Sequence, residues 1–415
     1  MSIHTTPPYP RLLERQLGRD LADYPVVAVM GARQVGKTTL ARKVGRERGL
    51  AYVTLDDRDT RQRAIDDPEG LLESIASAGA VIDEIQRVPE LLLAMKRVID
   101  LEQGGRGLGR FLVTGSNQPR VQAGGVADSL QGRVAYRTLR PLTIGELRYD
   151  DGEPVWTSLF THGLTDLITR LTETETLNRG LAWQDVVVAG GMPRALAAPA
   201  GERARILDDY TRTFASRDIR DILEVESSER FEAFFRLVGA RTGTILNESR
   251  LSRELGVAIR TVRRWLDALD RSYMTVRVRP YSRNAATRIV QAPKLFLVDS
   301  ALAMAAARET VATGFHMETL VANALHTWQD LGAGRAVYHW RLASGPEADF
   351  VLEQAQAVVP VEVKAGDRAD RRDGRHLEIF LDTHREAVCG LLLTSDPHVR
   401  AIADRVIAAP WWAVL

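Results

Sequence analysis

The chain has 415 residues, of which 45% are apolar and 26% are charged, and its formal net charge is +1. These values are typical of an ordinary globular protein, and the length suggests about two to four domains. A charge so close to zero gives no global basic field that would indicate a nucleic-acid partner. No stretch approaches the roughly 18 consecutive apolar residues of a membrane-spanning helix, so we expect no membrane partner.

Cysteine usage and the N-terminus indicate the cellular compartment. Cys389 is the only cysteine, which excludes intramolecular disulfides and metal sites built from several cysteines. Its neighbours are apolar, so we expect a buried strand residue rather than a nucleophile. The first ten residues lack the basic start and apolar core of a secretory signal. We therefore expect a cytoplasmic protein.

A glycine-rich loop follows the first apolar run, Val26–Met30, and precedes a predicted helix. Residues 31–38 match GxxxxGK[ST] at every fixed position, which predicts that the loop binds the phosphates of a nucleoside triphosphate. Lys37 can reach the β- and γ-phosphates, and the Thr38 hydroxyl is placed to bind Mg²⁺. A chance turn is the alternative, but the complete motif and its flanks disfavour it. The nucleotide-binding residues that we expect are Gly31, Ala32, Arg33, Gln34, Val35, Gly36, Lys37, Thr38 and Thr39.

A second motif completes a nucleotide hydrolase site. The apolar run from residue 80 ends in Asp83 and Glu84, about 45 residues beyond the loop. We expect Asp83 to hold Mg²⁺ and Glu84 to activate the attacking water. An Asp-Glu pair after an apolar strand is weak evidence alone, but it is strong evidence downstream of a complete phosphate-binding loop.

Residues in two further segments are candidates for contact with a nucleotide. The strand predicted near residues 109–117 ends in Thr114, Ser116 and Asn117, which could face the nucleotide because ligands bind at the carboxyl ends of such strands. A plain strand-to-loop turn is equally compatible. Arg133 could stabilise charge at a neighbouring chain's nucleotide, which leaves a homo-oligomer open. It could equally be an exposed arginine in a salt bridge.

These motifs resemble a family of bacterial and archaeal AAA-type ATPases that carry a C-terminal domain of unknown function. The resemblance covers nearly the whole chain, and it implies a parallel sheet between helices and ATP rather than GTP. The matching segments are GARQVGKTTL, VIDEIQ, FLVTGSN, LQGR, PLTIGE at residues 141–146 and GGMPR at residues 190–194.

The pattern of apolar and polar residues in the middle of the chain predicts a helical lid, followed by a winged helix-turn-helix. Helical patterns at residues 245–256 and 257–269 are separated by Gly256, and two strand-like runs follow. Residues 260–294 hold nine basic and two acidic residues, a local excess of seven positive charges. The excess favours DNA binding through the second helix, with phosphate contacts from the wing. The alternative is a protein-docking module.

The C-terminal segment carries acids and a lysine in the D-x(n)-E-x-K pattern of PD-(D/E)xK nucleases. Glu362 and Lys364 share one face of a predicted strand, and Asp349 joins them if the neighbouring strand pairs with it. Glu318, on a helix, matches the acid of the resolvase-like branch. We expect Glu318, Asp349 and Glu362 to bind Mg²⁺ and Lys364 to activate water or stabilise charge. The alternative is an inactive domain whose carboxylates form salt bridges.

Together these patterns predict an α/β protein: a P-loop ATPase domain, a helical lid and winged helix, and a C-terminal α/β nuclease-like domain. The expected function is ATP hydrolysis that controls a DNA-directed C-terminal half with a possible nuclease site. The alternative is an ATP-switched regulatory or scaffold protein. The terminal run from residue 409 is expected to be a packed strand. The expected domain boundaries are residues 1–147, 148–229, 230–305 and 306–415.

Overall fold

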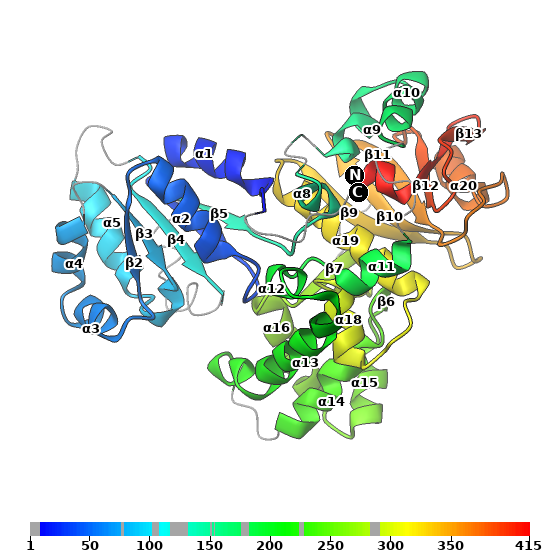
Figure 1. Cartoon of the computed structure of the whole chain (residues 1–415). Helices are drawn as coiled ribbons and strands as arrows, with labels where there is room; N and C mark the ends of the chain where they lie inside the picture. The colour runs from blue at the N-terminus through cyan, green and yellow to red at the C-terminus, as the bar shows by residue number, and fades with distance from the viewer. Residues whose placement is uncertain are drawn as a thin grey trace. The chain divides into compact units, whose positions relative to one another are not determined.

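The computed structural model describes residues 9–75, 79–101, 108–116, 132–149, 152, 154–175, 182–223, 228–282 and 291–415. These residues divide into two compact units (Figure 1). The N-terminal unit consists of Arg11–Arg140 with Asp267–Met274. The larger unit consists of Met1–Pro10, Pro141–Leu266 and Thr275–Leu415.

The N-terminal unit is built on a parallel sheet with the strand order β2-β3-β4-β1-β5. Strand β1, which lies between β4 and β5, is buried at all five positions, because helices pack against both it and its neighbours. The sequence predicted β1, β3, β4 and the helix α2 that follows the loop, but it did not predict α1 or α3. The strands are β1 (Val26–Met30), β2 (Ala51–Thr54), β3 (Ala80–Asp83), β4 (Phe111–Gly115) and β5 (Val134–Thr138), and the helices are α1 (Leu13–Asp23), α2 (Lys37–Glu47), α3 (Arg58–Asp66), α4 (Pro68–Ile75), η1 (Ile85–Arg87) and α5 (Leu91–Leu101).

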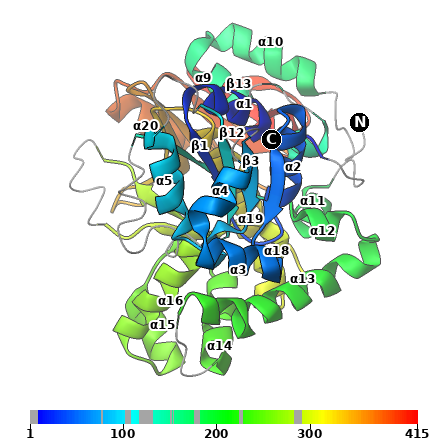
Figure 2. The ribbon, with the colours of Figure 1, turned by 90° about the vertical axis from the view of Figure 1, so that its left-hand side faces the viewer.

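The larger unit begins with short helices that pack on its apolar core. Helix α13 ends at Ser216, and a 3₁₀ turn follows it. Figure 2 shows α13 running past α14. The elements are α8 (Ile144–Leu147), η3 (Val155–Thr157), α9 (Ser158–Thr161), α10 (Leu164–Glu175), α11 (Trp183–Ala189), α12 (Pro193–Leu196), α13 (Ala200–Ser216), η5 (Asp218–Asp221) and α14 (Ser228–Gly239).

Two helices and two strands occur in the order that the sequence predicted from residue 245 onward. Helix α15 ends at Gly256, which adopts the left-handed conformation that glycine favours at a helix end. On α16 the apolar side chains of Val262, Trp265 and Leu266 are buried. Most of the wing segment, residues 283–290, lies outside the described residues. The elements are α15 (Glu248–Leu255), α16 (Ile259–Arg271), β6 (Thr244–Ile245), β7 (Thr275–Pro280) and β8 (Lys294–Leu297).

Among the described residues, the larger unit contains a nine-stranded sheet. Its strand order is β13-β14-β12-β11-β10-β9-β7-β8-β6. The parallel pairing of β7 with β9 joins the wing strands to the C-terminal strands. As the nuclease prediction requires, β10 and β11 pair antiparallel. The elements are α18 (Ser300–Ala307), α19 (Gly314–Asp330), β9 (Arg335–Arg341), β10 (Glu347–Gln354), β11 (Ala357–Val363), α20 (Arg375–Thr383), β12 (Gly390–Thr394), β13 (Arg400–Ala403), β14 (Val406–Pro410) and α21 (Trp411–Val414).

The last residues of the chain belong to the core of the larger unit. The sequence predicted a packed strand from residue 409, but the strand ends at Pro410 and the buried helix α21 follows. Cys389 is buried as expected, although it lies just before β12 rather than within it. Burial raises the pKa of its thiol to about 12, which keeps it protonated and unreactive. No described helix is long and apolar enough to cross a membrane.

Candidate functional site

The glycine-rich loop of the N-terminal unit lies between β1 and α2 and depends on its glycines. Gly31 has φ 153°, and a Cβ there would lie 2.2 Å from the carbonyl oxygen of Leu139. Gly36 has φ 101° and immediately precedes α2. The loop is also held from outside, because Arg11 donates a 2.7 Å hydrogen bond to the carbonyl oxygen of Val35. The backbone therefore needs glycine at both motif positions.

Lys37 is folded back against the loop that precedes it. Its Nζ donates to the carbonyl oxygens of Gly31 at 3.0 Å and Ala32 at 2.8 Å. The side chain is only 5% exposed. Burial lowers the pKa of Lys37 to about 8, and the carboxylates of Glu84 and Asp83 partly oppose that decrease. Lys37 is thus a partly desolvated cation at the start of a helix, which suits it to a phosphate ligand.

Thr38 and Asp83 meet at the carboxyl end of β3. The Thr38 hydroxyl lies 2.9 and 3.0 Å from the two carboxylate oxygens of Asp83. Tyr52 Oη donates to the same carboxylate at 3.0 Å, and Thr114 also donates to it. A hydroxyl and a buried carboxylate are hard oxygen donors, and this pair fits Mg²⁺.

Glu84 follows Asp83 in a backbone conformation that is unusual for a residue with a side chain. Its φ is 63°, and its N–H donates a 3.1 Å hydrogen bond to Thr114 Oγ1. Gln86 donates to the Glu84 carboxylate and, at 3.1 Å, to Ser116 Oγ. Non-glycine residues with such φ values cluster at functional sites, because the surroundings must hold them there. Gln86 in η1 thus holds the Glu84 carboxylate, while Thr114 of β4 holds the Glu84 backbone.

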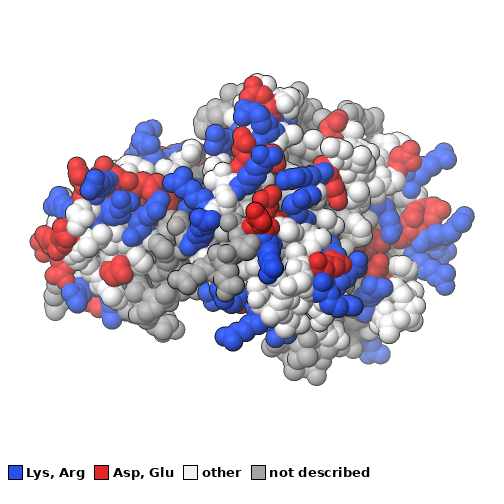
Figure 3. Space-filling view, turned by 90° about the horizontal axis from the view of Figure 1, so that it is seen from below, with Lys and Arg blue, Asp and Glu red and all other residues white. Residues whose placement is uncertain are grey.

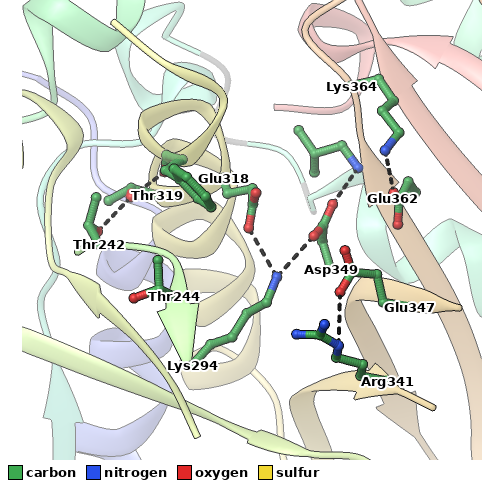
Figure 4. A network of polar contacts seen from close by, with 12 residues as sticks. Thr242, Thr244, Lys294, Glu318, Thr319, Arg341, Glu347, Asp349, Glu362 and Lys364 are labelled. Atoms are coloured by element: carbon green, nitrogen blue, oxygen red, sulfur yellow. Dashed lines mark hydrogen bonds and ion pairs between the residues drawn. The ribbon is translucent and has the colours of Figure 1, made fainter. Parts of the chain in front are cut away.

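A second cluster of charged side chains lies in the larger unit, where α19 faces β10 and β11 (Figure 4). Asp349 Oδ2 accepts a 3.0 Å hydrogen bond from the N–H of Val363. Lys364 Nζ lies 2.7 Å from Glu362 Oε1, while the buried Glu362 Oε2 has no hydrogen-bond partner among the described residues. Burial, followed by the neighbouring Asp349, raises the pKa of Glu362 and likewise that of Glu318. We call Glu318, Asp349, Glu362, Lys294 and Lys364 the carboxylate cluster.

Lys294, a member of this cluster, has a role that the sequence did not predict. Its Nζ lies 3.1 Å from Glu318 Oε2 and 2.9 Å from Asp349 Oδ1. Within the described part of the chain, no group of three or more His, Cys, Asp or Glu side chains is arranged to hold a metal ion. Two of the predicted acids, Glu318 and Asp349, therefore meet around an ammonium group, whereas Glu362 pairs with Lys364.

Three protein-family models match successive parts of the chain. The model described as "AAA domain" matches residues 23–148, which contain the loop, Asp83 and Glu84. This segment therefore matches an AAA domain, and its loop has the complete P-loop pattern. The other two models, DUF8612 at residues 181–313 and DUF4143 at residues 313–414, are both described as domains of unknown function.

Individual proteins resemble the whole chain more weakly. An uncharacterized protein of Mycobacterium tuberculosis is 26% identical over 420 residues, covering 96% of this chain and 84% of its own length. Among solved structures, the Walker-type ATPase of Pyrococcus abyssi has 14% identity and a TM-score of 0.44, covering 74% of this chain and 98% of its own. The ORC1 protein of Aeropyrum pernix, solved with DNA, has 15% identity and a TM-score of 0.28, covering 73% and 93%. Scores below 0.5 support no conclusion about fold or function here.

Two further site residues were predicted in the N-terminal unit, Asn117 and Arg133. Asn117 lies outside the described residues. Arg133 Nε lies 2.8 Å from Asp100, and both side chains are partly exposed, as in the salt-bridge alternative. Tyr52 and Gln86 were not predicted to contact Asp83 and Glu84. For Gln86 the sequence signal was its position just after β3, at the edge of the sheet where ligands bind, whereas Tyr52, the second residue of β2, carried no such signal.

Some basic side chains in the segment at residues 260–294 are already paired with acids. The ammonium of Lys294 pairs within the carboxylate cluster, and its side chain is only 13% exposed. Arg263 on α16 forms a 2.7 Å ion pair with Glu248 on α15. In the view of Figure 3, basic and acidic side chains are interspersed among the described residues. Arg260 and Arg264 on α16 remain exposed.

Proposed function

We propose that the chain hydrolyses ATP at the loop of residues 31–38 and that its nucleotide state controls a DNA-directed larger unit. The observation that carries the ATPase proposal is the meeting of Thr38 and Asp83 beside the buried Lys37. In the proposal, Lys37 and the loop N–H groups bind the phosphates. Thr38 and Asp83 would hold Mg²⁺, which neutralises phosphate charge when it is bound.

Glu84 is the residue that we assign to the attacking water. Its carboxylate is held by Gln86, and its N–H is held by Thr114, so both ends of the residue are fixed. A carboxylate positioned in this way accepts a proton from water as the water attacks the γ-phosphate. Ser116 extends the network from β4 through Gln86 and supports the same position.

Steady-state ATP hydrolysis and ATP affinity test these roles. We expect Glu84→Gln to lower the hydrolysis rate by about 10²- to 10⁴-fold, because the amide cannot accept the proton, while ATP binding persists. The matched control is Glu90→Gln, an exposed acid six positions further along the chain. Hydrolysis by the Glu84→Gln chain at the rate of the unaltered protein would refute the assignment.

DNA is the partner that we propose for the segment around α16. The helix buries Val262 and Trp265 and exposes Arg260 and Arg264, so its apolar side is packed and its basic side is accessible. We expect the Arg260→Ala, Arg264→Ala double variant to weaken DNA binding and to reduce its salt dependence, by about one unit of slope per lost phosphate contact. The control alters Arg205 and Arg212 on α13, two exposed arginines in helix ion pairs. A mobility-shift assay over a series of salt concentrations compares the DNA affinities of the α16 variant and the α13 control. Equal losses in both variants would contradict DNA binding through α16.

Two functions are possible for the carboxylate cluster. In the first, Glu318, Asp349 and Glu362 bind Mg²⁺ and Lys364 assists in DNA cleavage. In the second, the cluster does not cleave, and the protein is an ATP-switched regulator. The ion pairs of Lys294 favour the second, because they already compensate two of the three acids. Incubation of branched, single-stranded and duplex DNA with Mg²⁺ or Mn²⁺ tests the choice. DNA cleavage by the unaltered protein that is lost in Lys364→Ala would support the first function.

A further inference from the structure

Lys294 reaches the carboxylate cluster from a different part of the sheet than the acids that surround it. It is the first residue of β8, a strand of the predicted wing, whereas Glu318 comes from α19 and Asp349 from β10. The pairing of β8 with β7, and of β7 with β9, brings these elements together. Figure 4 shows the lysine side chain extending between the two carboxylates. The contact is thus built by the sheet and not by neighbours in sequence.

The burial of Lys294 shows that this is an interior ion pair. The exposed fractions of Lys294, Glu318 and Asp349 are 13%, 12% and 9%. Although burial alone lowers the pKa of Lys294, the charges of Asp349 and then Glu318 raise it above its ordinary value. The ammonium therefore stays charged, as a buried cation does only when acids compensate it.

The contacts of the ammonium are those that a divalent ion would need. It takes one oxygen from Glu318 and one from Asp349, and the second oxygen of Asp349 already accepts the N–H of Val363. Mg²⁺ or Mn²⁺ at this point would have to share the same two oxygens with a positive charge a few ångströms away. Such like-charge proximity in a buried site is strongly unfavourable.

The cluster nevertheless keeps one oxygen that indicates a latent ligand site. Glu362 is only 3% exposed, and its Oε2 has no hydrogen-bond partner among the described residues. Buried carboxylate oxygens are normally paired, so an unpartnered one beside two further acids needs an explanation. A cation bound by Glu362 together with Asp349 would satisfy it.

We propose that Lys294 is the resident cation of the carboxylate cluster: it excludes divalent ions from Glu318, Asp349 and Glu362, and loss of its ammonium opens a Mg²⁺- or Mn²⁺-binding site there. Lys364 does not have this role, because its side chain is 46% exposed and its ammonium pairs with Glu362 rather than with Glu318 or Asp349 among the described residues. The inference is independent of ATP hydrolysis, which takes place in the other unit.

Manganese binding to the full-length protein, measured by the loss of the free Mn²⁺ resonance signal without nucleotide, tests the proposal. The difference between each chain and its Asp349→Asn derivative isolates binding at the cluster from binding elsewhere. We expect no such difference in the unaltered protein. We expect Lys294→Met to gain one Asp349-dependent ion per chain, bound at least about tenfold more tightly than anything at that site in the unaltered protein.

Two matched variants separate the charge of Lys294 from its packing. Lys294→Arg retains the cation and should bind no ion at the cluster, whereas Lys364→Met removes the other lysine and should also gain none. Asp349-dependent Mn²⁺ binding by the unaltered protein would overturn the proposal, as would a folded Lys294→Met chain that gains no ion. If Lys294→Met does not fold, Lys294→Gln takes its place, and the comparison of the unaltered protein with Asp349→Asn still decides whether Lys294 excludes the ion.

Discussion

Lys37 combines burial with a position at the start of α2, and this combination determines how its charge responds to a ligand. Burial lowers its pKa to about 8, so in the free protein the amine loses its proton as the pH rises through that value. Phosphate oxygens favour the charged form and raise the pKa again. Nucleotide binding above the free-state pKa must therefore take up a proton, whereas binding well below it takes up none.

Proton uptake on ATP binding tests this property of Lys37. Calorimetric titrations in two buffers of different ionisation enthalpy should show uptake of up to about one proton per chain near pH 9 and much less near pH 7. The control is Lys43→Gln on the same helix, whose lysine is largely exposed and paired with Glu14. That variant should keep the uptake. Equal proton exchange at both pH values would show that Lys37 does not meet the phosphates.

Gly31 offers a second test at the residue scale. A Cβ at this position would lie 2.2 Å from the carbonyl oxygen of Leu139, so Gly31→Ala must displace the loop. We expect ATP binding to be lost, measured by fluorescence of a labelled nucleotide. Gly18→Ala in α1, where a Cβ would meet nothing closer than 3.9 Å, should leave binding unchanged. Normal ATP affinity in Gly31→Ala would contradict the steric argument.

The residues that sequence alone could predict are those whose partners lie in one continuous motif. Lys37 and Thr38 follow from the loop pattern, and Asp83 from the strand after which ligands bind. Tyr52 and Lys294 could not be predicted, because their partners are set by strand pairing. Lys294 was counted with the basic surface, since nothing near it in sequence indicates two acids 24 and 55 residues away.

At the scale of elements, α18 depends on a buried cap that also holds the glycine pair at residues 190 and 191. Asp299 accepts hydrogen bonds from the N–H of Leu302 at 2.8 Å and the N–H of Gly191 at 2.6 Å. A Cβ at Gly190 would lie 2.6 Å from Asp299 Oδ1, and one at Gly191 would lie 2.2 Å from the Leu142 carbonyl oxygen. The GGMPR segment is thus explained by close backbone packing rather than by catalysis.

Removing this cap should destabilise the larger unit. Asp299→Ala leaves two N–H groups unpaired, and we expect a loss of about 2 to 3 kcal/mol in the free energy of unfolding. Asn247→Ala removes the exposed cap of α15 and should cost only about 1 kcal/mol. Urea unfolding of both variants gives the comparison. Similar values for the two would mean that the buried contacts of Asp299 contribute little.

The terminal segment shows a limit of prediction at the same scale. Its apolar residues predicted burial correctly but not conformation, because a short apolar run fits a strand or a buried helix equally well. Pro410 ends β14, and α21 then packs its two tryptophans, Trp411 and Trp412, into the core. Tertiary packing, which no local pattern encodes, decided between the two.

At the scale of the whole molecule, the nine-stranded sheet links segments that the sequence assigned to separate domains. Because β7 pairs with β9, and Val278 and Phe296 share a core cluster with Trp328 and Phe350, residues 306–415 lack part of their own core. We expect a fragment of residues 306–415 to aggregate or to unfold without cooperativity in circular dichroism. A fragment of residues 141–415, which retains β7 and β8, should unfold cooperatively. Cooperative unfolding of the shorter fragment would support the boundary at residue 305.

The central claim is that the nucleotide state of the ATPase domain controls DNA binding by the larger unit. The most direct test is the DNA affinity of the Glu84→Gln chain, which should bind ATP without hydrolysing it, measured by fluorescence anisotropy with ATP, with ADP and without nucleotide. We expect the affinities with ATP and with ADP to differ by about tenfold, which corresponds to a coupling free energy of about 1.4 kcal/mol. The same DNA affinity in all three states would contradict the claim.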